Sequence, residues 1–114
     1  MTYDERLADR IRDLVEDEPG LTERKMFGGL AFLVHGNMAV AASNEGGVLL
    51  RVPPEETEQH LAHPHVDPFV MRGREMNGWL RVVPEGLGTD IELKRWVNVG
   101  VTYARSLPPK QDPR

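Results

Sequence analysis

The sequence predicts an α+β domain of two layers, in which helices cover one face of an antiparallel sheet. Apolar residues recur at helical spacing near both ends of the chain. Between them, short apolar, β-branched and aromatic runs are separated by Gly, Pro and Asn turn signals. These runs follow one another through short turns, which is typical of antiparallel pairing. The expected order is helix, three strands, helix, two strands, helix.

The composition is that of one ordinary globular domain. Hydrophobic residues make up 39% and charged residues 28% of the 114 residues, which is typical of a folded chain rather than a disordered one. There are 0 cysteines, which excludes disulfides and thiolate metal sites and suits a reducing cytosol. The charged opening residues do not resemble a signal peptide, and no run is long enough to span a bilayer. We therefore expect a cytoplasmic protein that does not associate with membranes.

The first helix is expected at residues 2–18. Thr2 and Glu5 have the spacing of a capping box, in which each side chain bonds a free backbone amide of the first turn. Pro19 and Gly20 follow and would stop the helix. Its apolar stripe would consist of Tyr3, Leu7, Ile11, Leu14 and Val15.

The longest apolar stretch, residues 25–42, is expected to form the centre of the fold. Residues 26–34 predict a strand, and Gly36 with Asn37 predicts a tight hairpin turn. Residues 38–42 predict the returning strand.

Two glycines interrupt the first of these strands, and a further strand follows the hairpin. Gly28 and Gly29 indicate a bulge or the close approach of another backbone, a side chain or a ligand. We favour a structural role, since the chain lacks both a GxGxxG and a Walker lysine motif. Residues 43–47 predict a second turn, and residues 48–52 predict the third strand.

The next segment predicts a short helix and a second pair of strands. Pro53 and Pro54 would begin the helix, since proline suits the first helical position. Residues 69–71 and 79–83 predict the strands, and residues 72–78 predict a loop between them.

The last helix is expected to begin at Thr89, which has capping-box spacing to Glu92. Gly100 lies inside this helix, where glycine costs about 1 kcal/mol relative to alanine. We therefore expect Gly100 to permit close packing against the sheet. The chain would form one domain over residues 1–109, and residues 110–114 would form a disordered tail. The apolar stripe of this helix would consist of Leu93, Trp96, Val97, Gly100, Ala104 and Leu107.

Short motifs occur in a fixed order along nearly the whole chain. Their positions include Met26, Phe27, Gly28, Gly29, Gly36, Gly78, Trp79 and Trp96. This order resembles that of the TfoX/Sxy N-terminal domain family, named for bacterial regulators of natural competence. The resemblance implies a two-layer fold like that of secretion chaperones and a regulatory context, and it transfers no catalytic residue or cofactor. Full-length competence regulators carry a second, C-terminal domain, so the chain looks like a stand-alone N-terminal domain.

Three histidines are the weak metal candidates. His60, His63 and His65 lie close together and Asp67 follows, a donor set that would suit zinc or nickel. Their spacing matches no established zinc motif. We favour a polar loop that binds no metal.

Arg72, Arg74, Glu75 and Met76 form the candidate partner or anion surface. Arginine forks bind carboxylates and phosphates, and loops often carry binding residues. We favour a second interpretation, in which Arg74 pairs with Glu75 or a nearby helix acid, while Met76 and Trp79 help to fill the core.

The favoured function is that of a small regulatory domain that binds a protein partner and catalyses no reaction. A homodimer through an exposed sheet face or edge is also plausible. One alternative is weak nucleic-acid binding through Arg72 and Arg74 or Lys94 and Arg95, although the net charge of −4 disfavours it. The other is a metal-dependent enzyme that uses residues 60–65.

Overall fold

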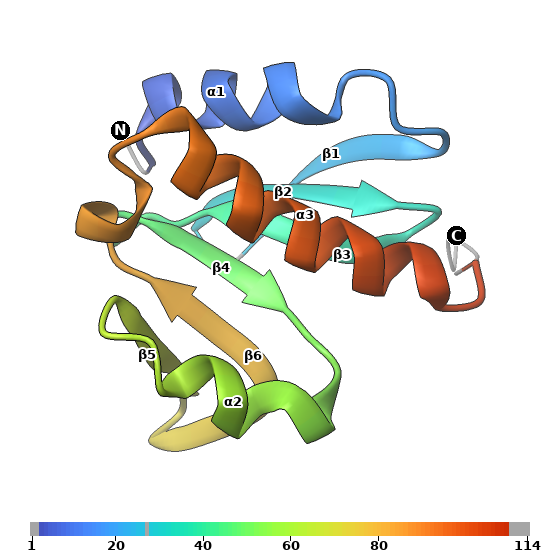
Figure 1. The fold of residues 1–114 in the computed structure, drawn as a ribbon. Helices are drawn as coiled ribbons and strands as arrows, with labels where there is room; N and C mark the ends of the chain where they lie inside the picture. Colours follow the sequence, from blue (N-terminus) through green and yellow to red (C-terminus); the bar gives the residue numbers. More distant parts are fainter. Residues whose placement is uncertain (1–2, 27, 110–114) are drawn as a thin grey trace.

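The computed structural model describes residues 3–26 and 28–109. These residues form a six-stranded antiparallel sheet in the order β1-β2-β3-β4-β6-β5, with the helices packed on one face (Figure 1). The predicted α+β class and two-layer arrangement are confirmed. In chain order the elements are α1 (Glu5–Val15), β1 (Leu21–Met26), β2 (Gly29–Val34), β3 (Asn37–Ala42), β4 (Val48–Arg51), a 3₁₀ turn (Pro54–Glu56), α2 (Thr57–Leu61), β5 (Val66–Met71), β6 (Arg74–Val82), a second 3₁₀ turn (Pro84–Leu87) and α3 (Asp90–Ser106).

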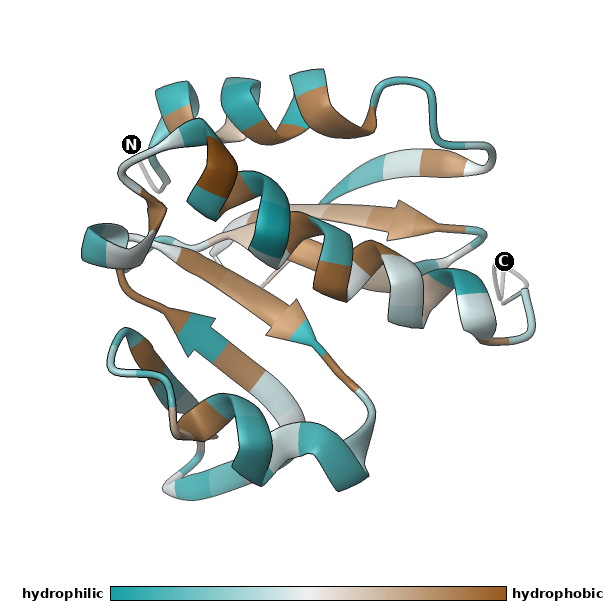
Figure 2. Cartoon of the chain, in the orientation of Figure 1, coloured by the Kyte–Doolittle hydropathy of each residue, from teal (hydrophilic) through white to brown (hydrophobic). Residues whose placement is uncertain are grey.

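The main core lies between the helices and the sheet. Strands β2 and β4 are mostly hydrophobic along their length (Figure 2). Phe32 and Leu50 on the sheet are fully buried, as are Ile11 on α1 and Leu93 on α3. Burying a side chain of this size contributes about 1.5–3 kcal/mol, so this layer supplies most of the stability.

The prediction of five strands was wrong, because β1 was missed. Its residues Thr22 to Lys25 are polar and exposed, since β1 is an edge strand. An ion pair ties it to α1, where Arg12 donates to the Glu23 carboxylate at 2.6 and 3.0 Å. The predicted strand over residues 26–34 is therefore the end of β1, a turn and β2.

The structural explanation of the two central glycines fits this turn. Gly28 lies in the turn between β1 and β2, where its φ of 75° favours glycine. At Gly29, a Cβ atom would overlap the carbonyl group of Ala42 on β3. Phe27, the other motif residue here, lies outside the described residues.

The β2–β3 hairpin is present, but its turn lies one residue earlier than predicted. The two turn residues are His35 (φ 50°) and Gly36 (φ 83°), both left-handed as in a type I′ turn. Asn37 is instead the first residue of β3, paired with Val34. Its side chain is buried and donates to the Pro108 carbonyl at 2.9 Å.

The first helix is shorter than predicted. Asp4 caps it, since its Oδ1 accepts from the amides of Arg6 and Leu7, and the helix ends at Val15. Leu14, expected in the apolar stripe, is 39% exposed. Thr2, expected as the cap, lies outside the described residues.

The last helix begins as predicted. Thr89 and Glu92 form the capping box. Trp96 is buried in the main core, and a Cβ at Gly100 would overlap the Ala39 carbonyl oxygen on β3. The close packing expected at Gly100 is therefore present. The predicted tail over residues 110–114 lies outside the described residues.

The predicted loop over residues 72–78 was also wrong. Strand β6 already begins at Arg74, and only Arg72 and Gly73 form the turn. Both turn residues have positive φ, which Arg72 adopts at 55°. Nothing in an arginine marks it for that conformation, so the tight turn could not be read from the sequence.

Within the described residues, no helix has the length and hydrophobicity needed to cross a membrane.

Candidate partner-binding site

The sheet has a second apolar cluster on the face opposite the helices. Ala31, Leu33, Met38, Ala41 and Leu49 form its buried floor. Three larger, partly exposed side chains pack against this floor, namely Met26, Phe69 and Trp79. Methionine and aromatic side chains of this kind adapt readily to a bound surface. This face of the sheet is therefore suited to contact a binding partner and not only solvent.

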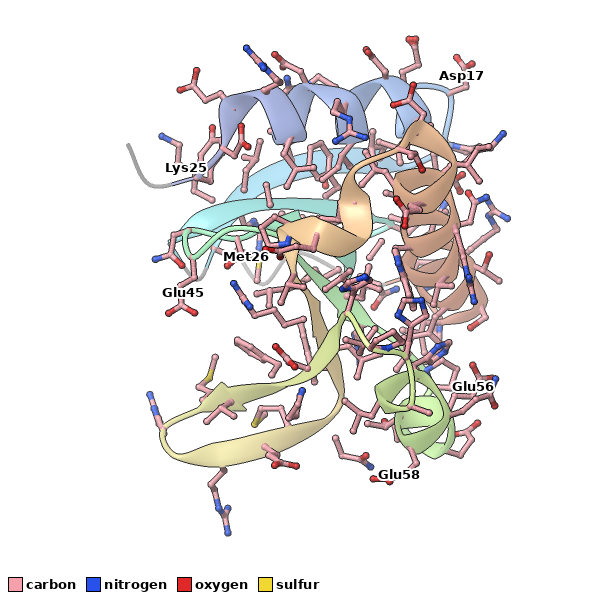
Figure 3. All side chains as sticks on the ribbon, turned by 60° about the vertical axis from the view of Figure 1, so that its left-hand side comes forward. Asp17, Lys25, Met26, Glu45, Glu56 and Glu58 are labelled. Carbon is pink, nitrogen blue, oxygen red and sulfur yellow. The ribbon has the colours of Figure 1, made fainter. Side chains whose placement is uncertain are left out.

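A cleft of about 560 Å³ opens at the base of the β5–β6 hairpin. The turn that joins β3 to β4 forms one wall, and Figure 3 shows Glu45 on this turn opposite the hairpin. The cleft falls within the size range of ligand sites, about 300–1,000 Å³. Its lining residues are Ser43, Asn44, Glu45, Leu49, Asp67, Pro68, Phe69, Val70, Met71, Arg72 and Arg81.

Arg81 is the fixed cation of this cleft. Its Nη2 donates to the carbonyl oxygens of Glu45 at 2.8 Å and Gly46 at 3.0 Å. Its Nε is buried and has no hydrogen-bond partner among the described residues. A guanidinium that is held in place but incompletely satisfied can donate a charge-assisted hydrogen bond to an incoming carboxylate.

The candidate surface predicted from the sequence lies at the tip of the same hairpin. Arg72 lines the cleft, whereas Arg74 and Glu75 are exposed on β6 and Met76 is partly buried. Within the described residues no ion pair joins Arg74 to Glu75 or to a helix acid. Consecutive strand residues point to opposite faces of the sheet, so the side chains of Arg74 and Glu75 cannot meet. Val70, which lines the cleft, is 53% exposed.

Trp79 belongs to the second cluster rather than to the main core. Its ring centroid lies 6.2 Å from that of Phe69, and the Arg51 guanidinium lies 5.6 Å from its centroid. Gly78, the motif residue before it, is buried with a φ of 87°, and its amide donates to Thr57 Oγ1 at 2.9 Å. The Gly78-Trp79 motif thus joins α2 to the base of the hairpin.

The histidines gather on the other side of the sheet. The rings of His60 and His63 lie edge-on to Trp96, with centroids 6.1 and 5.2 Å away. His63 Nδ1 accepts the amide of His65 at 3.2 Å. No group of three His, Asp or Glu residues in the described part of the chain is arranged to hold a metal ion. Packing around Trp96 explains the cluster without a metal.

The second basic candidate lies at the start of α3. Lys94 is exposed, and the Arg95 guanidinium lies 5.3 Å from the Trp96 ring centroid. This pair is on the helix face, and the arginines of the hairpin belong to a different part of the sheet. The two basic candidates therefore do not combine into one stripe.

The family model of the TfoX N-terminal domain matches residues 13–104. The chain belongs to this family. No curated protein and no solved structure gives a match. The TfoX N-terminal domain match includes all six strands, and thus both the hairpin and the cleft.

The hairpin tip is predictable from the sequence, whereas the cleft is not. Arg81 lies between Leu80 and Val82 in a predicted strand, and alternation places it on the opposite face from these buried residues. An arginine at that position is usually solvated. Only the tertiary structure brings the turn after β3 against it.

Proposed function

We propose that this TfoX N-terminal domain is a regulatory module that acts by binding a protein partner through the β5–β6 hairpin and the cleft at its base. The observation that carries the proposal is the position of exposed Val70 on the wall of a cleft that also contains the fixed guanidinium of Arg81. Large apolar side chains beside a positioned arginine are typical of protein-binding surfaces.

The partner is proposed to present an extended segment with an acidic side chain. β5 lies at the edge of the described sheet, with β6 as its neighbour, and an extended peptide can bind by adding a strand to such an edge. Pro68 has no backbone N–H to donate, and a register shift in the sheet follows it. Pairing between β5 and an added strand is therefore limited to part of β5. The acidic side chain would then reach Arg81, where an acceptor is missing.

The experiment uses affinity capture from native lysate with the full chain as bait, followed by crosslinking of retained proteins. Val70→Glu is compared with Ile91→Glu, a matched control because Ile91 is also apolar and exposed, at 82%, but lies on α3. We expect one partner to bind the wild type and Ile91→Glu, to survive nuclease, and to be lost at least about tenfold with Val70→Glu. Crosslinks should join that partner to the β5–β6 hairpin.

Equal capture by the two variants would refute the hairpin as the binding surface. Crosslinks between two copies of this chain would identify a homodimer as the occupant, and sedimentation would then give the stoichiometry. Retention that disappears with nuclease would favour nucleic-acid binding, whose affinity should fall steeply with salt.

A further inference from the structure

A second cleft lies between the α2 region and the C-terminal half of α3. Its volume is about 390 Å³, and its accessible lining is mostly apolar. Pro53, Glu56 and His60 form one wall, and Val99 and Tyr103 contribute to the other. This volume falls within the range of small-molecule sites, about 300–1,000 Å³.

The polar group at this cleft is a carboxylate that has no lysine or arginine partner among the described residues. The Glu56 side chain is 46% exposed, and its Oε1 lies 3.5 Å from His60 Nε2. That nitrogen is buried and has no hydrogen-bond partner among the described residues. In the described part of the chain no lysine or arginine lies within ion-pair distance of Glu56. The charge of Glu56 therefore remains available to a ligand.

The basic side chain that contacts Tyr103, Arg51 at the end of β4, is already engaged. The Arg51 guanidinium lies 5.7 Å from the Tyr103 ring centroid and 5.6 Å from that of Trp79. Glu55 and Glu58, next to the cleft in sequence, are exposed acids. Like charges repel an anionic ligand and attract a cationic one, so the local charge favours a cation.

We propose that this cleft binds a small amphipathic amine. The apolar body of the amine packs against Pro53, Val99 and the Tyr103 ring, and its ammonium group pairs with the Glu56 carboxylate. The proposal is independent of the protein-binding function, because the hairpin cleft lies on the opposite face of the sheet.

The test is an NMR titration of the full chain with two probes of the same shape, benzylamine and benzyl alcohol. We expect saturable shifts at His60, Val99 and Tyr103, with a dissociation constant of about 1 mM for the amine, as is typical of so small a probe. The alcohol should bind about 5- to 10-fold more weakly, since it lacks the charge.

Glu56→Gln should reduce the affinity for benzylamine about 5- to 10-fold and leave that for benzyl alcohol unchanged. Glu58→Gln is the matched control, with the same loss of charge on an exposed residue two positions further along, in α2, that does not line the cleft. Equal binding of both probes to the wild type, no saturable shift up to about 10 mM, or equal weakening by both variants would overturn the proposal. The comparison of the two probes on the wild type decides the matter even if Glu56→Gln does not fold.

Discussion

Replacing Gly100 by alanine should destabilise the domain, although alanine is the better helix former. The new Cβ would overlap the carbonyl oxygen of Ala39 and lie 3.0 Å from its carbon. The new Cβ is fixed to the backbone of α3, and the obstacle belongs to the backbone of β3. Neither can turn aside as a side chain could, so α3 must move away from β3 as a unit. Helix propensity returns about 1 kcal/mol, whereas overpacking a core contact costs about 1–3 kcal/mol or more. With a rigid obstacle the upper end applies, and we expect a net loss of about 2 kcal/mol.

Urea unfolding followed by circular dichroism measures this loss directly. A loss of this size should also lower Tm by about 8 °C in a domain of this length. Gly88→Ala is the matched control: Gly88 has a φ of −69°, and only Glu92 Oε1, 4.0 Å away, would be near the new Cβ. That substitution should be neutral or stabilise by up to about 1 kcal/mol. A Gly100→Ala variant as stable as the wild type would refute the close approach of α3 to β3.

Two further substitutions test interactions that hold the fold. Thr57→Val removes a buried hydroxyl that accepts from the Gly78 amide at 2.9 Å. Thermal unfolding should therefore show that the free energy of unfolding falls by about 1–3 kcal/mol. The control Thr22→Val, at an exposed position, should not lower it. Arg105 donates to Glu18 at 2.7 and 3.0 Å and thereby lowers the pKa of Glu18. The pair therefore stabilises the fold fully at pH values above the ordinary glutamate pKa of about 4.3. This stabilisation is lost as the pH falls through the lowered pKa of Glu18. Urea midpoints measured from pH 7 downward should fall less steeply for Glu18→Gln, and parallel curves would contradict this explanation.

Local patterns allowed most of the fold to be predicted. The central hairpin, the strand that follows it and the Thr89 capping box each depend on residues close in sequence. β1 gave no such signal, because an edge strand that pairs on one side can carry four consecutive polar residues, here Thr22 to Lys25. Its existence depends on pairing with β2 and on the ion pair between Arg12 and Glu23.

The candidate site was predictable only at its tip. Arg72 and Arg74 stood out because two arginines lie close together in a predicted loop beside Trp79. The cleft below them joins residues that are distant in sequence, since Glu45 and Arg81 meet through a backbone carbonyl. Periodicity along the chain carries no information on such contacts, so Arg81 could only be found in the folded structure.

The position of α3 has a consequence for synthesis. This helix follows every strand in the chain, yet it covers the apolar face of the central strands, including Val40 and Leu50. A nascent chain therefore carries β2, β3 and β4 out of the ribosome with only α1 to cover this face, and it cannot complete the burial until α3 emerges. Chaperones that recognise exposed apolar strands have that interval in which to bind. A chain that stops before Trp96 should be held by them or degraded, because it lacks the helix that closes the core.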